Sequence, residues 1–135
     1  MDVPASEKDL LSVRKLFERG PLERTVAPIA YSLGIASVAK PVIQAHRYSV
    51  GCGIGAHTDA ADRELRIVLS FAEDWSPENG GVWILGKEPA FKEDILLLPP
   101  RMNAGFAFVS NASSYHGLSV VSVGRVYGVT IRISI

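Results

Sequence analysis

The sequence His57-Thr58-Asp59 places a histidine and an aspartate two residues apart. Side chains two residues apart in a β-strand point to the same face, so His57 and Asp59 can converge on one point. An imidazole and a carboxylate are two parts of the 2-His-1-carboxylate site, which holds Fe(II) and leaves coordination positions open. His116 is the candidate third ligand. Arg125, nine residues further on, is a candidate cation for the same cavity.

The length and composition of the chain are sufficient for a buried hydrophobic core. It has 135 residues, of which 47% are hydrophobic. We expect one domain over residues 1–135, with helical support at 1–34 and a β core at 35–135. Lysine plus arginine and aspartate plus glutamate number 14 each, and this balance disfavours a nucleic-acid or membrane-surface partner.

Cysteine usage and hydropathy indicate the compartment. The single cysteine, Cys52, excludes an intramolecular disulfide and suits a reducing, cytoplasmic setting. No stretch approaches the roughly 20 apolar residues of a membrane span. Residues 1–19 lack the apolar region of a signal peptide, so we expect neither secretion nor membrane insertion.

The pattern along the chain predicts two short helices followed by β-structure. Apolar residues recur at helical spacing in 7–19 and, around Pro28, in 21–33. From residue 35 onward, alternation and turn residues predict seven or eight short strands, which favours a sandwich or jelly roll. The expected strands are 41–50, 56–59, 66–71, 82–85, 95–98, 106–109, 116–121 and 125–135.

The order His-x-Asp, a long gap, His and then Arg resembles the iron(II)/2-oxoglutarate-dependent dioxygenases, in particular their prolyl-hydroxylase-like branch. Tyr48 stands upstream of His-x-Asp, as it does in that branch. The stretch from Ile67 to Phe71, then Trp75 and Gly80-Gly81-Val82-Trp83, is similar to the branch's strand, tryptophan and double-glycine pattern. Residues 99–108 resemble its lead-in to the distal histidine.

This resemblance implies a double-stranded β-helix (jelly roll) and a hydroxylase that uses Fe(II), 2-oxoglutarate and O2. Iron would be bound by His57, Asp59 and His116. An unactivated C–H bond would be hydroxylated while 2-oxoglutarate is decarboxylated to succinate. The substrate class stays open among small molecules, amino acids and peptidyl side chains.

The far carboxylate of 2-oxoglutarate needs a cation, and an arginine fork matches it in shape and charge. Arg125 begins the last expected strand, where the family places this arginine, and the Tyr48 hydroxyl could add a donor. Arg132 is the rival, because Ile133-Ser134 after it is similar to the Arg-x-Ser element of another branch. Seven residues separate the two arginines, so they have opposite parity unless a bulge intervenes. Thr130 could also line the pocket.

Several of these assignments have a purely structural alternative. His57 could be a surface loop histidine after a glycine turn, and His116 could be packed beside Tyr115. His46 has the parity of Tyr48, so it could face the interior or serve as a structural histidine.

Two other classes of function stay open. A non-catalytic jelly-roll module would keep the fold and bind a ligand, but it would not require all three ligands and Arg125. A metalloenzyme of cupin type would turn over without 2-oxoglutarate. A homodimer is one arrangement that could cover the substrate side of the pocket.

Overall fold

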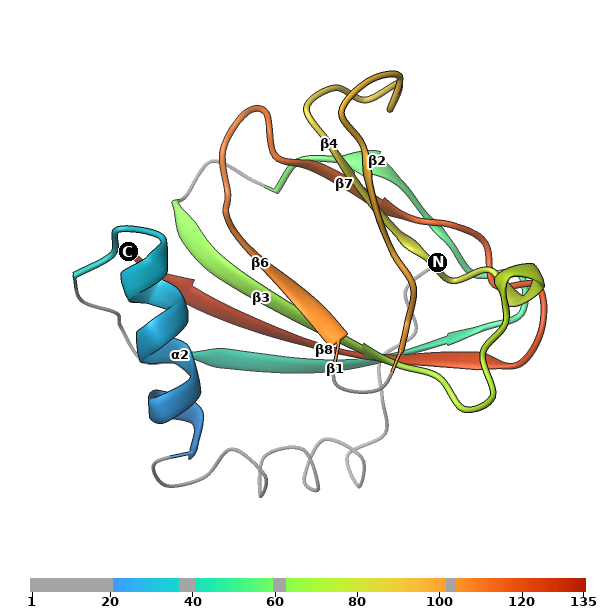
Figure 1. Ribbon diagram of the computed structural model, residues 1–135, viewed down its shortest axis with the longest axis horizontal. Coiled ribbons are helices and arrows are strands. Elements are labelled where there is room, and N and C mark those ends of the chain that lie inside the picture. Colours follow the sequence, from blue (N-terminus) through green and yellow to red (C-terminus); the bar gives the residue numbers. More distant parts are fainter. Residues whose placement is uncertain (1–20, 37–40, 60–62, 102–103) are drawn as a thin grey trace.

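The computed structural model describes residues 21–36, 41–59, 63–101 and 104–135 (Figure 1). The helix predicted at 7–19 lies outside the described residues. Two four-stranded sheets face each other, and every strand pairing that links their strands is antiparallel. This arrangement is the jelly roll that the sequence predicted, and the eight strands found in the described part of the chain agree with the seven or eight expected.

The major sheet carries most of the strand length. Its order is β1 (Val42–Ser49), β8 (Arg125–Ser134), β3 (Glu64–Phe71) and β6 (Ala104–Val109). The minor sheet has shorter strands. Its order is β2 (Ile54–His57), β7 (Tyr115–Leu118), β4 (Trp83–Gly86) and β5 (Leu96–Leu98), and a 3-10 turn, η1 (Pro77–Asn79), precedes β4.

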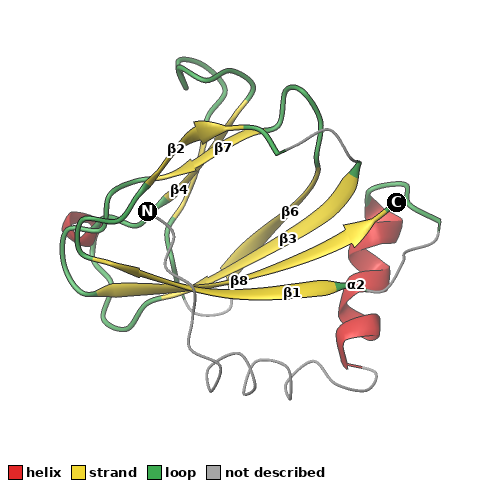
Figure 2. Cartoon of the chain, turned by 180° about the vertical axis from the view of Figure 1, so that it is seen from behind, coloured by secondary structure: helices red, strands yellow, loops and turns green. Residues whose placement is uncertain are grey.

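Helix α2 (Pro21–Ser32) covers the outer face of the major sheet. Val26 and Ala30 lie four residues apart, so they share one face of the helix and pack against the sheet. Figure 2 shows α2 beside the major sheet and away from the minor one. The predicted helix is therefore confirmed, and Pro28 lies inside it at an exposed position. Among the described residues, no helix has the length and apolar character needed to cross a membrane.

A second apolar cluster fills the space between the two sheets. Its buried members are Tyr48, Val68, Trp83, Leu118, Val121 and Val126. The Trp83 indole N–H donates to Ser70 Oγ at 2.9 Å, which satisfies two buried polar groups inside the cluster. Trp83 is thus a packing residue, anchored to both sheets.

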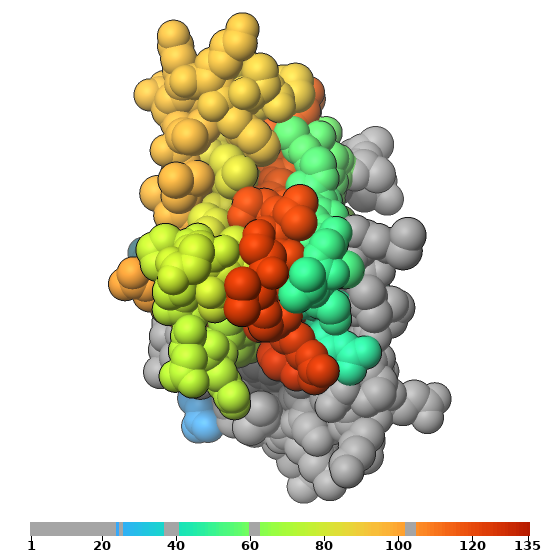
Figure 3. Space-filling view, turned by 90° about the vertical axis from the view of Figure 1, so that its right-hand side faces the viewer, coloured from blue at the N-terminus to red at the C-terminus, as the bar shows by residue number. Residues whose placement is uncertain are grey.

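One end of the molecule gathers the β1–β2, β3–β4 and β7–β8 connections, which lie side by side in Figure 3. The Gly51 N–H donates to Val121 O at 2.8 Å, and the Ser122 N–H donates to Asn79 O at 2.7 Å. Gly80 has φ +70°, and a Cβ there would collide with the carbonyl oxygen of Val120. The double glycine therefore lets these connections close against one another.

Candidate metal centre and its cavity

His57, Asp59 and His116 come together at one edge of the space between the sheets. His57 ends β2 and is the register partner of His116 on β7, while Asp59 follows two residues after β2. One donor atom from each residue lies within 4.8 Å of the others. Asp59 Oδ1 is 3.7 Å from His57 Nε2, and Asp59 Oδ2 is 3.4 Å from His116 Nε2.

Backbone carbonyls orient both imidazole rings. His57 Nδ1 lies 2.9 Å from Gly55 O, and His116 Nδ1 lies 3.0 Å from Ser114 O. A carbonyl oxygen can only accept a hydrogen bond, so each Nδ1 carries the proton and donates it. In the neutral rings, both Nε2 lone pairs are then left facing Asp59. A hydrogen bond from the other ring nitrogen to a carbonyl is the usual support of a metal-binding histidine.

These three acceptor groups fit a bound cation. His116 is buried, with 7% of its side chain exposed, and this burial lowers its pKa, although the Ser114 carbonyl and Asp59 oppose the shift. The ring is therefore neutral at pH 7. Asp59 Oδ2 is buried and accepts no hydrogen bond of good geometry from the described residues, although Arg66 Nε lies 3.0 Å away as an ion-pair partner. Two lone pairs aimed at a carboxylate repel it unless a positive charge lies between them, and a divalent metal supplies that charge.

Arg66 is a residue of this site that the sequence reading missed. It lies on the inner face of β3, and its Nε is 3.0 Å from Asp59 Oδ2. Its Nη2 is 3.0 Å from Glu64 Oε2, and Arg132 binds the same Glu64 carboxylate with two hydrogen bonds of 2.9 and 3.1 Å. The hydrogen bond from Arg132, supported by the charge of Arg66, lowers the pKa of Glu64 despite its burial. Two arginines and two carboxylates thus form one neutral network beside the candidate metal centre.

A cavity of about 130 Å³ extends from the triad between the sheets. Trp83, Val68, Ile54 and Phe108 form its apolar walls. The polar residues on its lining are Gln44, His46, Tyr48, His57, Asp59, Arg66, His116 and Thr130. The predicted pocket residues Tyr48 and Thr130 therefore lie in the cavity that contains the triad.

The two arginines predicted to bind the far carboxylate of 2-oxoglutarate do not line the cavity. Arg125 is exposed and is the register partner of Ser49, whereas its neighbour Val126 points inward and is 2% exposed. The structure thus places Arg125 outside the cavity. Arg132 points inward, as it would have to if it were the clamp. Its guanidinium is bound by Glu64, however, and it does not line the cavity.

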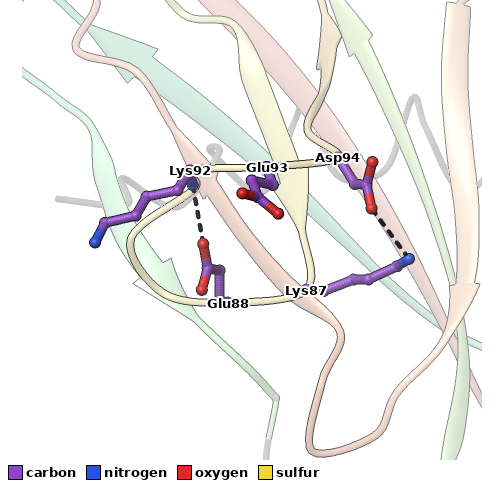
Figure 4. A pocket seen from close by; sticks show the side chains of 5 residues that line it. All are labelled: Lys87, Glu88, Lys92, Glu93 and Asp94. Atoms are coloured by element: carbon purple, nitrogen blue, oxygen red, sulfur yellow. Dashed lines mark hydrogen bonds and ion pairs between the residues drawn. The ribbon is translucent and has the colours of Figure 1, made fainter.

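A larger hollow, of about 400 Å³, lies in the β4–β5 connection and is lined by five charged residues (Figure 4). Lys87 Nζ lies 3.5 Å from Asp94 Oδ2, and the Lys92 backbone N–H donates to Glu88 Oε1 at 3.3 Å. Both members of the Lys87–Asp94 pair are more than three-quarters exposed, so their attraction is strongly screened. The hollow has no buried ligand set, so the smaller cavity is the better candidate site.

Comparison with known proteins supports the same fold. No family model and no curated protein matches the sequence. A Pseudomonas putida prolyl-4-hydroxylase superposes with TM-score 0.69 and 16% identity, over 84% of this chain and 60% of that chain. A Trichoplax adhaerens prolyl hydroxylase, in complex with a hypoxia inducible factor oxygen degradation domain peptide, gives TM-score 0.74 and 14% identity over 99% and 61%.

A viral collagen prolyl hydroxylase from Paramecium bursaria Chlorella virus-1, in its 2-oxoglutarate complex, gives TM-score 0.64 and 15% identity, over 84% of this chain and 70% of that chain. The chain spans about 60% of the length of the first two of these structures. At such identities the likeness shows the fold. That fold is the jelly roll expected from the sequence, and these three prolyl hydroxylases share it.

Proposed function

We propose that the chain is an Fe(II)- and 2-oxoglutarate-dependent dioxygenase that hydroxylates an unactivated C–H bond. The observation that carries this proposal is the convergence of His57 Nε2, His116 Nε2 and the Asp59 carboxylate, with donor atoms within 4.8 Å of one another. Two neutral imidazoles and one carboxylate leave a divalent metal with one positive charge and open positions. Such a site suits a chelating dianion and O2.

The chain's own groups would hold the metal in a defined place. The carbonyls of Gly55 and Ser114 would hold the two rings, and the ion pair with Arg66 would hold the Asp59 carboxylate. Bound iron would supply O2 activation. The protein would supply orientation and a partly dry cavity.

A second hollow of about 130 Å³ supports the proposal that a substrate binds beside the triad. It shares His116 and Phe108 with the cavity that contains the triad. Leu85, Gly86 and Tyr115 also line it, so an aliphatic group could approach His116 without burying a polar atom unpaired. The peptide bound to the Trichoplax neighbour supports a peptidyl substrate among the candidate classes.

An anaerobic titration tests the proposal. Purified protein is loaded with Fe(II) and titrated with 2-oxoglutarate, and the weak visible absorption band of the chelate is followed. We expect a saturable band in the wild type. His57→Ala should abolish metal binding and the band with little loss of stability, because 40% of the His57 side chain is exposed.

Asp59→Asn and Asp94→Asn form a matched pair, since each removes one negative charge. Asp94 is exposed in the β4–β5 connection, so Asp94→Asn should retain the band, whereas Asp59→Asn should lose it. Metal binding without any band would favour the cupin-type alternative. No metal binding would leave a ligand-binding module.

A further inference from the structure

Strand β5 lies at an edge of the minor sheet, and its apolar side chains are exposed. It pairs along one side with β4, and among the described residues no strand pairs with its other side. Ile95, Leu96 and Leu97 are 44%, 55% and 55% exposed, and they are the longest run of consecutive exposed large hydrophobic residues in the described part of the chain. An edge that combines unpaired backbone groups with exposed apolar side chains is a template for a further strand.

The length over which this edge can pair is limited. Residues 95–98 contain no charged residue and no proline, which are the usual features that block pairing at an edge. Pro99 and Pro100 follow directly, and neither has an N–H to donate to a new strand. A partner at this edge must therefore match a short apolar run and gain further contacts at both ends of it.

A second copy of the same strand meets this condition. In a two-fold dimer the same surface of both copies forms the contact, so an antiparallel pair of β5 strands is symmetric about one residue. The register that overlaps β5 with itself in full is centred on Leu97, its middle residue. Leu97 then lies opposite Leu97 of the second copy, and Leu96 lies opposite Leu98 of the second copy. Side chains directly opposite in antiparallel strands are in contact.

The same register brings opposite charges together. Glu93 lies four residues before Leu97, and Arg101 lies four residues after it, so each Glu93 is opposite the Arg101 of the other copy. Both residues are exposed. Asp94 is paired with Lys87, whereas Glu93 beside it forms no ion pair among the described residues (Figure 4). The carboxylate of Glu93 is thus available to a cation from outside the hairpin.

Trp75 supports the opposite charge. The Arg101 guanidinium lies over the Trp75 ring, 5.8 Å from its centroid, and no carboxylate of the described residues forms an ion pair with it. A guanidinium stacked on an aromatic ring keeps its edge free for a carboxylate. The two ends of the apolar run therefore carry complementary charges at equal distances from Leu97.

We propose that the chain forms a two-fold dimer through β5, which joins two four-stranded minor sheets into one eight-stranded sheet. The leucines form the centre of the interface, and a Glu93–Arg101 ion pair closes each end. An apolar centre within a charged rim is the usual arrangement of a protein interface. The second copy is a better fit than an unrelated peptide, because one strand supplies both the apolar run and the two complementary charges. The contact is short, so the dimer is reversible.

Sedimentation velocity over a concentration series tests the dimer without metal or substrate, so the result does not depend on the proposed function. Leu97→Lys places two ammonium groups opposite each other at the symmetry axis and should raise the dissociation constant about 10-fold or more. Val42→Lys is the matched control, since Val42 is 56% exposed on β1, an edge strand of the other sheet. It should leave the dissociation constant unchanged.

Charge reversal tests the register. Glu93→Arg and Arg101→Glu should each raise the dissociation constant about 3- to 30-fold, because symmetry removes two ion pairs at once and sets like charges opposite each other. The variant with both reversals should recover most of the wild-type affinity. Circular dichroism verifies that each variant is folded. The inference is overturned by a wild type that stays monomeric, by a dimer that survives Leu97→Lys, by dissociation in Val42→Lys, or by a double reversal that dissociates as readily as the single ones.

Discussion

The two faces of the major sheet have opposite chemistry, although the same strands build both. The outer face of β3 and β8 is apolar and packs against α2. Its buried residues are Leu65, Ile67, Val129, Ile131 and Ile133. The inner face of the same strands carries Glu64, Arg66, Thr130 and Arg132, which form the ion-pair network and part of the cavity wall.

This difference assigns stability and function to alternate residues. Outward side chains are buried without polar partners, so their contribution is hydrophobic packing. Inward side chains near the triad form ion pairs, and their contribution is to position charge beside the candidate metal ligands. Because side chains alternate with period 2, a shift of one residue in register would exchange the two roles completely.

The largest expected effect belongs to the outer face. Ile131 is 1% exposed and packs in the cluster with Val26 and Ala30 of α2. Ile131→Ala should lower the free energy of unfolding by about 2–5 kcal/mol, and Ile131→Val by about 0.5–1.5 kcal/mol. Denaturant titration measures both, and the Mn(II) affinity of the folded fraction should not change. A weaker metal site in Ile131→Val would contradict the separation of the two faces.

A smaller loss of stability, with a loss of function, is expected at Arg66. Arg66→Met keeps the aliphatic stem but leaves Asp59 and Glu64 with fewer partners. Since the side chain is 18% exposed, we expect a loss of about 1–3 kcal/mol together with weaker Mn(II) binding. Arg47→Met is the matched control, because Arg47 is exposed on the outer face of β1. Equal Mn(II) affinity in the Arg66→Met and Arg47→Met variants would show that Arg66 does not support the metal site.

The contribution of Glu64 to stability on the inner face should depend on pH. Its pKa in the folded state lies below the ordinary 4.5, chiefly because Arg132 donates hydrogen bonds to it. The unfolded chain therefore binds the proton more readily, and the stabilisation is present above about pH 4.5 and lost as pH falls through the folded-state pKa. The stability difference between wild type and Glu64→Gln should shrink with acidification over that range. A difference independent of pH would show that the ion pair contributes nothing.

Local pattern was enough to predict much of this fold. Strand alternation and glycine turns are set by neighbouring residues. The donor atoms of His57 and Asp59 lie close together, although β2 ends at His57 and Asp59 follows it rather than sharing the strand. Local pattern did not show which alternate residues of β8 face the cavity. Arg125 shares its parity with Val129 and Ile131, and that apolar parity turned out to face α2 rather than the cavity.

Arg66 was missed for the same reason. In β3 the apolar residues Leu65 and Ile67 alternate with the charged Glu64 and Arg66, a pattern that ordinarily places charge on the solvent side. Here the helix takes the apolar side, so the charged side faces the second sheet. Only the tertiary contact between α2 and the major sheet decides between these two orientations.

The smallest expected effect is at Arg125, and it is the most direct test of this parity. Arg125→Ala removes an exposed side chain on the outer face, so stability should change by no more than about 0.5 kcal/mol and 2-oxoglutarate affinity less than about twofold. Calorimetric titration of Mn(II)-loaded protein measures the affinity. A large loss would mean that β8 enters the sheet one residue out of the described register after the turn at Gly124. Such a shift would point Arg125 inward and Val126 outward, and it would restore the arginine clamp that the sequence pattern predicted.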